Sequence, residues 1–289
     1  MTDDGNHTAG PSAPGGEPDA WSAMALRWEQ VWPPLRPTEE DLALYWEAAA
    51  GWMRERGTPR VLLLGGTPEL YHLPWPACTD LLAADGNAAM VAHVWPGPPG
   101  QVRCVDWLEL DLPAGSRDLV LSDGGLDMLP YPRAQQRLVD VIRAVLADAG
   151  LCVLRVYALP AQRESPEEVL ADLAAGRIRN RAVLQLRLGM ALQESAAAGV
   201  GFGEIWRAVR EAVRDPEALA RRLGWAVREL VPEHLPQPGV EAFRFHFLTV
   251  EQVRELFCDG AGGFTLESVR VPAYDLGALC PTLVFRRQR

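Results

Sequence analysis

Residues 60–69 read RVLLLGGTPE, and this stretch decides the fold. Four consecutive Val and Leu residues between Arg60 and Gly65 are too few for a globular helix and are typical of a strand buried on both faces, as in a parallel sheet. Gly65 and Gly66 then allow a sharp turn at the carboxyl end of that strand. In open α/β sheets, this is the edge at which ligands bind.

Strand-like and helix-like segments alternate along most of the chain. Residues 38–56 show a helical period, with Thr38 as a cap, acids in the first turn, arginines in the last and Gly57 after it. Such alternation predicts an α/β fold with a Rossmann-like, doubly wound and mostly parallel sheet. Strands are expected at 60–64, 81–84, 102–105, 118–122, 151–157, 264–271 and 282–287, and core helices at 38–56, 87–95, 133–148 and 249–258.

Residues 164–240 differ from the rest because they are rich in Ala, Leu, Arg and Glu and have a helical period. Ser165-Pro166 and Asp215-Pro216 are helix-start pairs. Helices are expected near 166–175, 181–198, 203–214 and 215–230. The chain is thus predicted to comprise a disordered tail (1–19), an N-terminal helical cap (20–57), a Rossmann-like cofactor-binding core (58–163), a helical insertion or lid (164–240) and a return to the core (241–289).

Charge and cysteine content narrow the classes of function. A formal charge of −10 argues against general binding to nucleic acid, which requires a positive surface. The five cysteines are scattered and form no CxxC pair, so reduced thiols are expected rather than disulfides or a metal site. The chain has neither an apolar run of roughly 18 residues nor a basic region before an apolar one at its start, so we expect a cytoplasmic protein with no membrane partner.

Four strand ends carry turn-forming or acidic residues: Gly65, Asp85, Asp106 and Asp123. Each interval spans one strand and one crossover, which places all four along one edge of the predicted sheet. An acid about 20 residues after a glycine turn is suited to accept both hydroxyls of a ribose. Asp106 can accept from the exocyclic amine of a purine, and the Trp107 indole can pack on its face. One such aspartate is more often a cap or turn former, but four in register favour a nucleoside site.

These residues resemble the class I S-adenosylmethionine-dependent methyltransferases. The resemblance covers roughly 58–160 and 241–287 and includes an extra strand pair after the fifth parallel strand. It implies a seven-stranded sheet with an antiparallel final strand and a helical insertion between the fifth and sixth strands. It is strongest for a bacterial branch with a first motif G-x-T-P-E-L, here residues 65–70, and a preceding P-L-R-P-T-x-x-D segment, here residues 34–41.

In this resemblance, S-adenosyl-L-methionine is the cofactor. Gly65, Gly66 and Thr67 contact its methionine part, Asp85 binds the ribose, and Asp106 with Trp107 lies at the adenine. The full set of expected cofactor-binding residues is Gly65, Gly66, Thr67, Pro68, Glu69, Asp85, Gly86, Asn87, Met90, Asp106, Trp107, Asp123 and Gly124. The usual acid-x-G-x-G-x-G motif is incomplete, because Leu63 stands at the acid and the two later glycines are absent. Glu69 is a candidate to receive the methionine ammonium instead.

Methyl transfer from a sulfonium is an in-line displacement, so a general base is needed only when the acceptor must lose a proton. Residues near the expected site nominate Asp123, Tyr131 and His246 for catalysis, with Tyr157 and Tyr274 as further possibilities. Arg155, inside a buried strand, requires an acid partner or an anionic ligand. A cluster of arginines near the second insertion helix is either a solvated face or a site for a carboxylate, phosphate or partner: Arg177, Arg179, Arg181 and Arg187.

The leading hypothesis is methyl transfer to an O or N atom of a small molecule, in bacterial secondary metabolism. A non-catalytic cofactor-binding or interaction protein of the same fold is the alternative. Three further hypotheses are less favoured: methylation of RNA or protein, aminopropyl transfer, and dinucleotide binding. The last is weaker because GGTPEL does not match the dinucleotide-binding motif GxGxxG. The helical insertion is a candidate surface for a homodimer.

Overall fold

The computed structural model describes residues 20–231, 244–259 and 263–288. The predicted tail (1–19) and the end of the predicted insertion (232–240) lie outside these residues. Within the described ranges, no helix has both the length and the apolar character needed to cross a bilayer.

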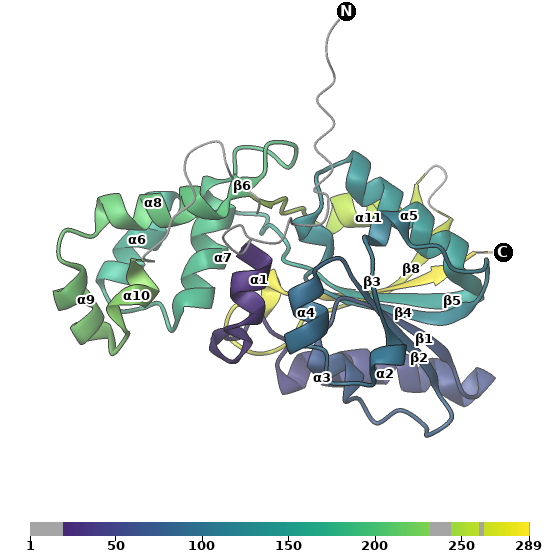
Figure 1. Cartoon of the computed structure of the whole chain (residues 1–289). Coiled ribbons are helices and arrows are strands. Elements are labelled where there is room, and N and C mark those ends of the chain that lie inside the picture. Colours follow the sequence, from purple (N-terminus) through teal and green to yellow (C-terminus); the bar gives the residue numbers. More distant parts are fainter. Residues whose placement is uncertain (1–19, 232–243, 260–262, 289) are drawn as a thin grey trace, which may run out of the picture.

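A seven-stranded sheet forms the centre of the molecule (Figure 1). Its order is β3-β2-β1-β4-β5-β9-β8. The five strands β1 to β5 pair in parallel, and β9 is antiparallel to both β5 and β8. This confirms the predicted fold class, including the antiparallel final strand. The bounds are β1 Arg60–Leu64, β2 Asp80–Asp85, β3 Val102–Cys104, β4 Arg117–Asp123, β5 Leu146–Arg155, β8 Phe264–Arg270 and β9 Thr282–Arg287.

Helices cover both faces of the sheet, as a doubly wound fold requires. In Figure 1, α2 and α3 lie on one side and α5 and α11 on the other, while α1 lies beside α4. Their bounds are α1 Ala20–Ala25, α2 Glu39–Arg56, α3 Pro68–Tyr71, α4 Ala88–His93, α5 Arg133–Val145 and α11 Val250–Cys258. The short 3-10 turns are η1 Trp28–Gln30, η2 Pro99–Gln101, η3 Trp107–Glu109, η4 Leu126–Met128 and η5 Gly277–Leu279.

Local signals explain where β1 and α2 begin and end. Val61 to Leu64 are all buried, since β1 lies between β2 and β4 with helices on both faces. Thr38 and Asp41 form a reciprocal capping box at the start of α2, and Gly57 follows its last residue with φ +89°. The predicted start and end of this helix are therefore confirmed.

The residues after β5 form a helical lobe at one side of the sheet (Figure 1). Its helices are α6 Pro166–Ala174, α7 Arg181–Leu192, α8 Phe202–Ala212, α9 Pro216–Leu223 and α10 Val227–Leu230. A two-stranded pair that the sequence pattern did not predict joins the lobe to the returning chain: β6 (Val200–Gly201) and β7 (Arg244–Phe245). The lobe has its own core, which Tyr157, Met128 and Leu35 extend to the carboxyl ends of β4 and β5.

Two element boundaries differ from prediction at the junction of α5 and β5. The helix ends at Val145 rather than Asp148, and β5 begins at Leu146, which pairs with Arg117. The register shifts between Arg117 and Leu119, and Ala149 has φ +60°, so residues 147–150 form an irregular segment within the strand. Periodicity alone misses this irregularity because Val145 and Leu146 continue the apolar stripe of the helix.

Two insertion helices are shorter than predicted. Helix α7 ends at Leu192 because the buried Gln193 leaves the helix and bonds through its side-chain amide to both backbone groups of Phe247, at 2.9 and 2.8 Å. The predicted helix at 215–230 is two helices, since Gly224 adopts a left-handed conformation that ends α9.

Candidate functional site

The glycine turn after β1 and the acid at the end of β2 are in direct contact. The backbone N–H of Gly66 donates to Oδ2 of Asp85 at 2.9 Å, and that of Asn87 donates to Oδ1 at 2.8 Å. Gly65, with φ +106°, donates its own N–H to the Ala84 carbonyl at 2.8 Å. The two strand ends thus form one corner, which we call the β1/β2 corner.

Asp85 carries a buried negative charge that backbone donors stabilise. Burial raises the pKa of its carboxyl above the usual range, and the N–H groups of Asn87 and Gly66 offset part of that effect. No Arg or His of the described chain makes an ion pair with it. Each carboxylate oxygen can accept a further hydrogen bond, so Asp85 retains the capacity to bind hydroxyl donors.

The strand ends at this corner lie close together. A Cβ atom added to Gly66 would lie 3.6 Å from Oδ2 of Asp85, which is ordinary van der Waals contact. A Cβ added to Gly86 would lie 3.7 Å from Cα of Asp106, so the ends of β2 and β3 are adjacent. The strand ends therefore converge as their spacing predicted.

Only one of the two carboxylate oxygens of Glu69, in the first turn of α3, accepts a hydrogen bond from a described residue. Its Oε1 accepts from Nε of Arg36 at 2.6 Å, and the Arg36 guanidinium lies 5.2 Å from the centre of the Trp28 ring. Its Oε2 is buried and accepts no hydrogen bond from the part of the chain that the structure describes. A buried carboxylate oxygen without a donor is unfavourable and suits an ammonium group.

Asp106 and Trp107 adopt different environments. Asp106 is exposed, and its Oδ1 caps η3 by accepting from the Leu108 N–H at 2.9 Å. Trp107 is half-buried and donates Nε1–H to the Ala84 carbonyl at 2.7 Å. The Asp106 carboxylate therefore caps the adjacent 3-10 turn, whereas the Trp107 indole is hydrogen-bonded to the end of β2.

The Trp107 ring fits between two glycines. A Cβ on Gly65 would lie 3.7 Å from its Cζ2, and a Cβ on Gly125 would lie 2.7 Å from its Cη2. The ring thus occupies space between the segments that follow β1 and β4. This is the point at which the strand order of the sheet reverses, and where ligands bind in open α/β sheets.

Asp123, at the end of β4, is engaged by a buried arginine. Oδ1 and Oδ2 accept from Nε and Nη2 of Arg155 at 2.5 and 2.9 Å, and neither side chain is more than 4% exposed. Burial lowers the pKa of the Arg155 guanidinium, but the Asp123 carboxylate outweighs it and holds that pKa above its ordinary value. The partner that the sequence left open for Arg155 is therefore an acid. We call this pair, with its surroundings, the β4/β5 corner.

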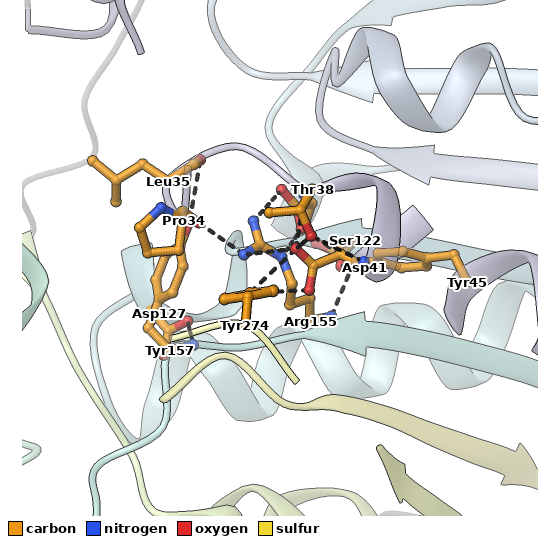
Figure 2. Close-up of polar contacts among 11 residues, drawn as sticks. Pro34, Leu35, Thr38, Asp41, Tyr45, Ser122, Asp127, Arg155, Tyr157 and Tyr274 are labelled. Carbon is orange, nitrogen blue, oxygen red and sulfur yellow. Dashed lines mark hydrogen bonds and ion pairs between the residues drawn. The ribbon is translucent and has the colours of Figure 1, made fainter. Parts of the chain in front are cut away.

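A strap before α2, residues 33–38, covers the β4/β5 corner. Figure 2 shows Arg155 at the centre of the group, with its Nη1 donating to the Pro34 carbonyl at 2.7 Å. The Tyr157 hydroxyl donates to the Leu35 carbonyl at 3.2 Å. Asn180, in the helical lobe, donates to the Pro33 carbonyl at 3.1 Å. The strap therefore binds the sheet and the lobe at once.

Two further tyrosines complete this network. Tyr45 donates to the Ser122 carbonyl at 2.6 Å and accepts from the Arg155 N–H at 3.0 Å. Tyr274 donates to the buried Asp41, whose Oδ2 is 3.8 Å from Nη1 of Arg155. Burial raises the pKa of the hydroxyls of Tyr45, Tyr157 and Tyr274, so they act as donors rather than as bases.

His246 lies beside the segment that follows β4. Its backbone N–H donates to the Asp127 carbonyl at 2.7 Å, and its ring Nδ1 is 2.8 Å from the Ala196 carbonyl. Since a carbonyl only accepts, Nδ1 carries the proton and Nε2 is left with a lone pair. Burial lowers the pKa of the imidazole, which keeps it neutral.

The remaining predicted residues have local roles in the structure. Tyr131 is half-buried and packs against the core beside α5. Asn87 caps α4, Met90 is buried in that helix, and Thr67 with Pro68 begins α3. Gly124 has φ +63° and lies against the Tyr157 ring.

Asp127 is an acid that sequence reasoning missed. It is 1% exposed in η4, its Oδ2 accepts from the Tyr157 N–H at 2.9 Å, and its Oδ1 accepts from no other described residue. Burial raises the pKa of its carboxyl to about 8. The sequence shows only that Asp127 stands between the apolar residues Leu126 and Met128, which does not distinguish a buried acid from an exposed one.

The arginine cluster of the lobe separates into different environments. Arg187 pairs with Asp172 at 2.6 Å and with Glu164, and Arg177 pairs with Asp172 at 2.5 Å. Arg179 is exposed. Arg181 instead stacks on an aromatic ring, 4.6 Å from the centre of Trp206. Across residues 20–231, 244–259 and 263–288, no three His, Cys, Asp or Glu side chains gather in a way that could hold a metal ion.

Comparisons with known proteins show likeness at two levels. No protein-family model matches the chain. A protein of Mycobacterium avium (strain 104) named "Putative S-adenosyl-L-methionine-dependent methyltransferase" is 31% identical in an alignment of 132 residues, which covers 40% of this chain and 42% of that protein. A protein of the same name from Mycolicibacterium paratuberculosis has the same identity and coverage. The chain thus matches less than half the length of these relatives.

Solved structures share the fold along nearly the whole chain. A structure from Rhodobacter sphaeroides, named as a "Putative Zn-dependent Alcohol Dehydrogenases" protein, has a TM-score of 0.58 at 14% identity and covers 93% of this chain and 97% of its own. The N-methyltransferase NodS of Bradyrhizobium japonicum, solved with S-adenosylhomocysteine, has a TM-score of 0.50 at 11% identity, with 94% and 100% covered. The Rossmann dinucleotide order is 3-2-1-4-5-6, whereas here the antiparallel β9 lies between β5 and β8. The chain therefore has the Rossmann-like fold found in class I methyltransferases.

Proposed function

We propose that this chain binds S-adenosyl-L-methionine at the β1/β2 corner and transfers its methyl group to an O or N atom of a small molecule. The observation that carries the proposal is the contact between the Gly66 N–H and the buried Asp85 carboxylate, 2.9 Å apart at neighbouring strand ends. The likeness in fold and the partial sequence match to the mycobacterial relatives support it.

The residues at this corner fit the cofactor's functional groups. Asp85 has free capacity for the two ribose hydroxyls, and burial without a cation leaves its charge in need of donors. Oε2 of Glu69 is a buried acceptor without a partner and suits the methionine ammonium. Gly65 and Gly66 let the backbone approach a ligand closely because they carry no side chain.

When bound, the cofactor supplies an electrophilic methyl group on a sulfonium. The chain then has to hold the acceptor in line, exclude water and, for an acceptor that carries a proton, receive that proton. Of the three predicted catalytic residues, His246 best retains the properties of a base, because it is neutral with Nε2 as the lone-pair atom. Asp123 is neutralised by Arg155, so we assign it a positioning role for the strap.

A non-catalytic cofactor-binding protein is the second candidate. It is favoured by the position of Trp107, whose ring fills space between Gly65 and Gly125 at the reversal point of the sheet. A ligand that crosses this point has to displace the indole and break its bond to the Ala84 carbonyl. If the ring stays in place, an adenosine can bind at Asp85 while the methyl group has no route to an acceptor.

Calorimetric titration with S-adenosylhomocysteine tests cofactor binding. We expect the wild type to bind, and Asp85→Asn and Gly66→Ala to weaken the affinity by about tenfold or more, since each removes or obstructs a direct contact. Gly100→Ala is the matched control, because Gly100 is exposed and a Cβ there would meet nothing within 4 Å. Absence of binding by folded wild-type protein would reject the proposal.

Transfer of a labelled methyl group across a panel of small phenols, amines and carboxylic acids separates the two candidates. A labelled product that disappears in Asp85→Asn supports the enzyme. Binding of S-adenosylhomocysteine with no product from any acceptor favours the non-catalytic protein.

We further propose a cytoplasmic location, a role in bacterial secondary metabolism and a homodimer through the helical lobe, with no nucleic-acid or membrane partner. The net charge of −10 supports the absence of a nucleic-acid partner. Passage through heparin at low salt without retention is the expected result, and light scattering of the purified protein tests the dimer.

A further inference from the structure

Arg181, the first residue of α7, is a partly buried cation that faces aromatic rings. Its guanidinium carbon lies 4.6 Å from the centre of the Trp206 ring and 6.0 Å from that of Phe202, both on α8. Stacking on a ring fixes the plane of a guanidinium but leaves its N–H donors free along the edge. Trp206 is completely buried, so this platform is rigid.

The donors of Arg181 have no acceptor within the described chain. It forms neither an ion pair nor a hydrogen bond there, unlike Arg177 and Arg187 in the same lobe. The Glu229 carboxylate attracts the Arg181 guanidinium electrostatically, but its Oε2 already accepts a hydrogen bond from the Ala226 N–H at 2.6 Å. Burial, together with repulsion from Arg27, holds the pKa of the Arg181 guanidinium below its ordinary value. An added anion would relieve both effects.

A second unpaired donor belongs to the same cluster. Nε1–H of Trp206 is buried and has no acceptor among the described residues. Buried indole N–H groups normally find an acceptor. The cluster thus contains two hydrogen-bond donors that have no acceptor among the described residues, the Arg181 guanidinium and the Trp206 indole N–H. Because one of them is cationic, an anion would complement this cluster.

A short series of contacts connects Arg181 with the carboxyl edge of the sheet. The preceding residue, Asn180, donates to the Pro33 carbonyl at 3.1 Å. The next strap residue, Pro34, accepts from Arg155 at the end of β5. Trp206 also shares a hydrophobic core with Tyr157, which follows β5. Arg181 therefore lies in the layer of the lobe that adjoins the proposed methyl-transfer edge.

We propose that Arg181, on its Trp206 and Phe202 platform, binds the carboxylate of an anionic acceptor molecule. The assignment deepens the proposed function, on which its role in an acceptor site rests, by naming the substrate class as an organic carboxylate. The flat guanidinium edge matches a carboxylate in a two-point interaction, and the half-buried Phe202 ring beside it favours an aromatic or apolar body.

Benzoate is the probe, and benzamide is its neutral counterpart of the same shape. Two-dimensional NMR of tryptophan indole groups, with the Trp206 signal identified through Trp206→Phe, follows binding without cofactor. We expect benzoate to shift the Trp206 signal in a saturable way and benzamide to have no effect. Arg181→Gln should weaken benzoate binding by about tenfold or more. Arg181→Lys keeps the positive charge but lacks the planar guanidinium that binds both carboxylate oxygens, so it should weaken binding less.

Arg179→Gln is the matched control, because Arg179 is exposed and two residues away. It should bind benzoate like the wild type, and far-UV circular dichroism checks that every variant is folded. Equal shifts with benzamide, unchanged benzoate binding in Arg181→Gln, or no saturable shift in the wild type would each overturn the site. Inorganic phosphate is a parallel arm, and a response to phosphate alone would overturn the assignment to a carboxylate.

These experiments distinguish a failure of the proposed carboxylate site from a failure of the proposed methyltransferase function. Benzoate binding is measured without cofactor, so it persists if S-adenosylhomocysteine does not bind and the methyltransferase proposal is rejected. Conversely, S-adenosylhomocysteine binding in Arg181→Gln should match the wild type, because Asp85 and Glu69 are untouched.

Discussion

The β1/β2 corner and the β4/β5 corner each place an aspartate at the carboxyl end of a parallel strand, but they differ in what surrounds it. Asp85 accepts from two backbone N–H groups, whereas Asp123 is held by the Arg155 guanidinium at 2.5 and 2.9 Å. The first acid keeps capacity for a ligand, and the second ties together β4, β5 and the strap. Position at a strand end therefore does not fix the role of an acid; the groups brought to it by the rest of the chain do.

This difference predicts opposite responses to the same chemical change. Neutralising Asp85 should act mainly on ligand affinity, because the acid has no cation to leave behind. Neutralising Asp123 should act mainly on stability, because it leaves a buried guanidinium without its principal partner.

The largest expected effect is the loss of stability in Asp123→Asn or Arg155→Gln. We expect each to lower the free energy of unfolding by about 3–5 kcal/mol, since each leaves one buried charge unpaired. Urea unfolding followed by circular dichroism measures it. Arg177→Gln, which breaks a pair whose arginine side chain is 62% exposed, should cost no more than about 1 kcal/mol. A stable Asp123→Asn that has lost S-adenosylhomocysteine binding would show that Asp123 faces the ligand.

The second effect is a pH dependence from Asp127, beside the β4/β5 corner. Its carboxyl has a pKa of about 8 in the folded protein, above the unfolded value, so the folded state holds the proton more tightly. That contribution to stability is complete below about pH 4 and is lost as pH rises through about 8. Relative to Asp127→Asn, the wild type should lose about 3–4 kcal/mol of unfolding free energy between pH 5 and pH 8. Parallel Tm curves for the two proteins would contradict this.

A smaller effect is expected where the two corners meet, at Gly125. A Cβ there would lie 2.7 Å from Cη2 of Trp107 and 2.8 Å from Oγ of Ser122, while the backbone φ of −77° is open to alanine. Gly125→Ala should therefore lower stability by about 1–3 kcal/mol through crowding. In a Trp107→Ala background, most of that cost should disappear, and a double-mutant cycle measures the difference. Strict additivity would mean that the ring is not wedged between the segments.

The smallest effect on stability is expected at Gly66. Its added Cβ would meet only ordinary contacts, so Gly66→Ala should change the free energy of unfolding by no more than about 0.5 kcal/mol while weakening S-adenosylhomocysteine binding. Gly65→Ala is the contrast, because φ +106° at that residue strains an alanine. A large stability loss in Gly66→Ala would make this glycine structural rather than part of a ligand contact.

Local physics determined most of the fold from the sequence. The apolar run of β1, the Thr38 cap and the Gly57 end of α2 are signals within a few residues, and the structure has all three. The alternation of strands and helices predicted the mostly parallel sheet, and the spacing of the strands predicted that Gly66 and Asp85 lie together. These features follow from covalent neighbours and from the common direction of parallel strands, so no distant contact was needed to predict them.

Only the tertiary structure decided which polar groups meet. Arg155 is 32 residues from Asp123 and is also tied to Pro34, 121 residues away, and nothing in the sequence pairs them. The end of α7 at Gln193 depends on Phe247, 54 residues further on. A buried charge or amide takes whichever partner folding brings within reach, so the sequence alone shows the need for a partner, and the packed molecule determines which residue meets it.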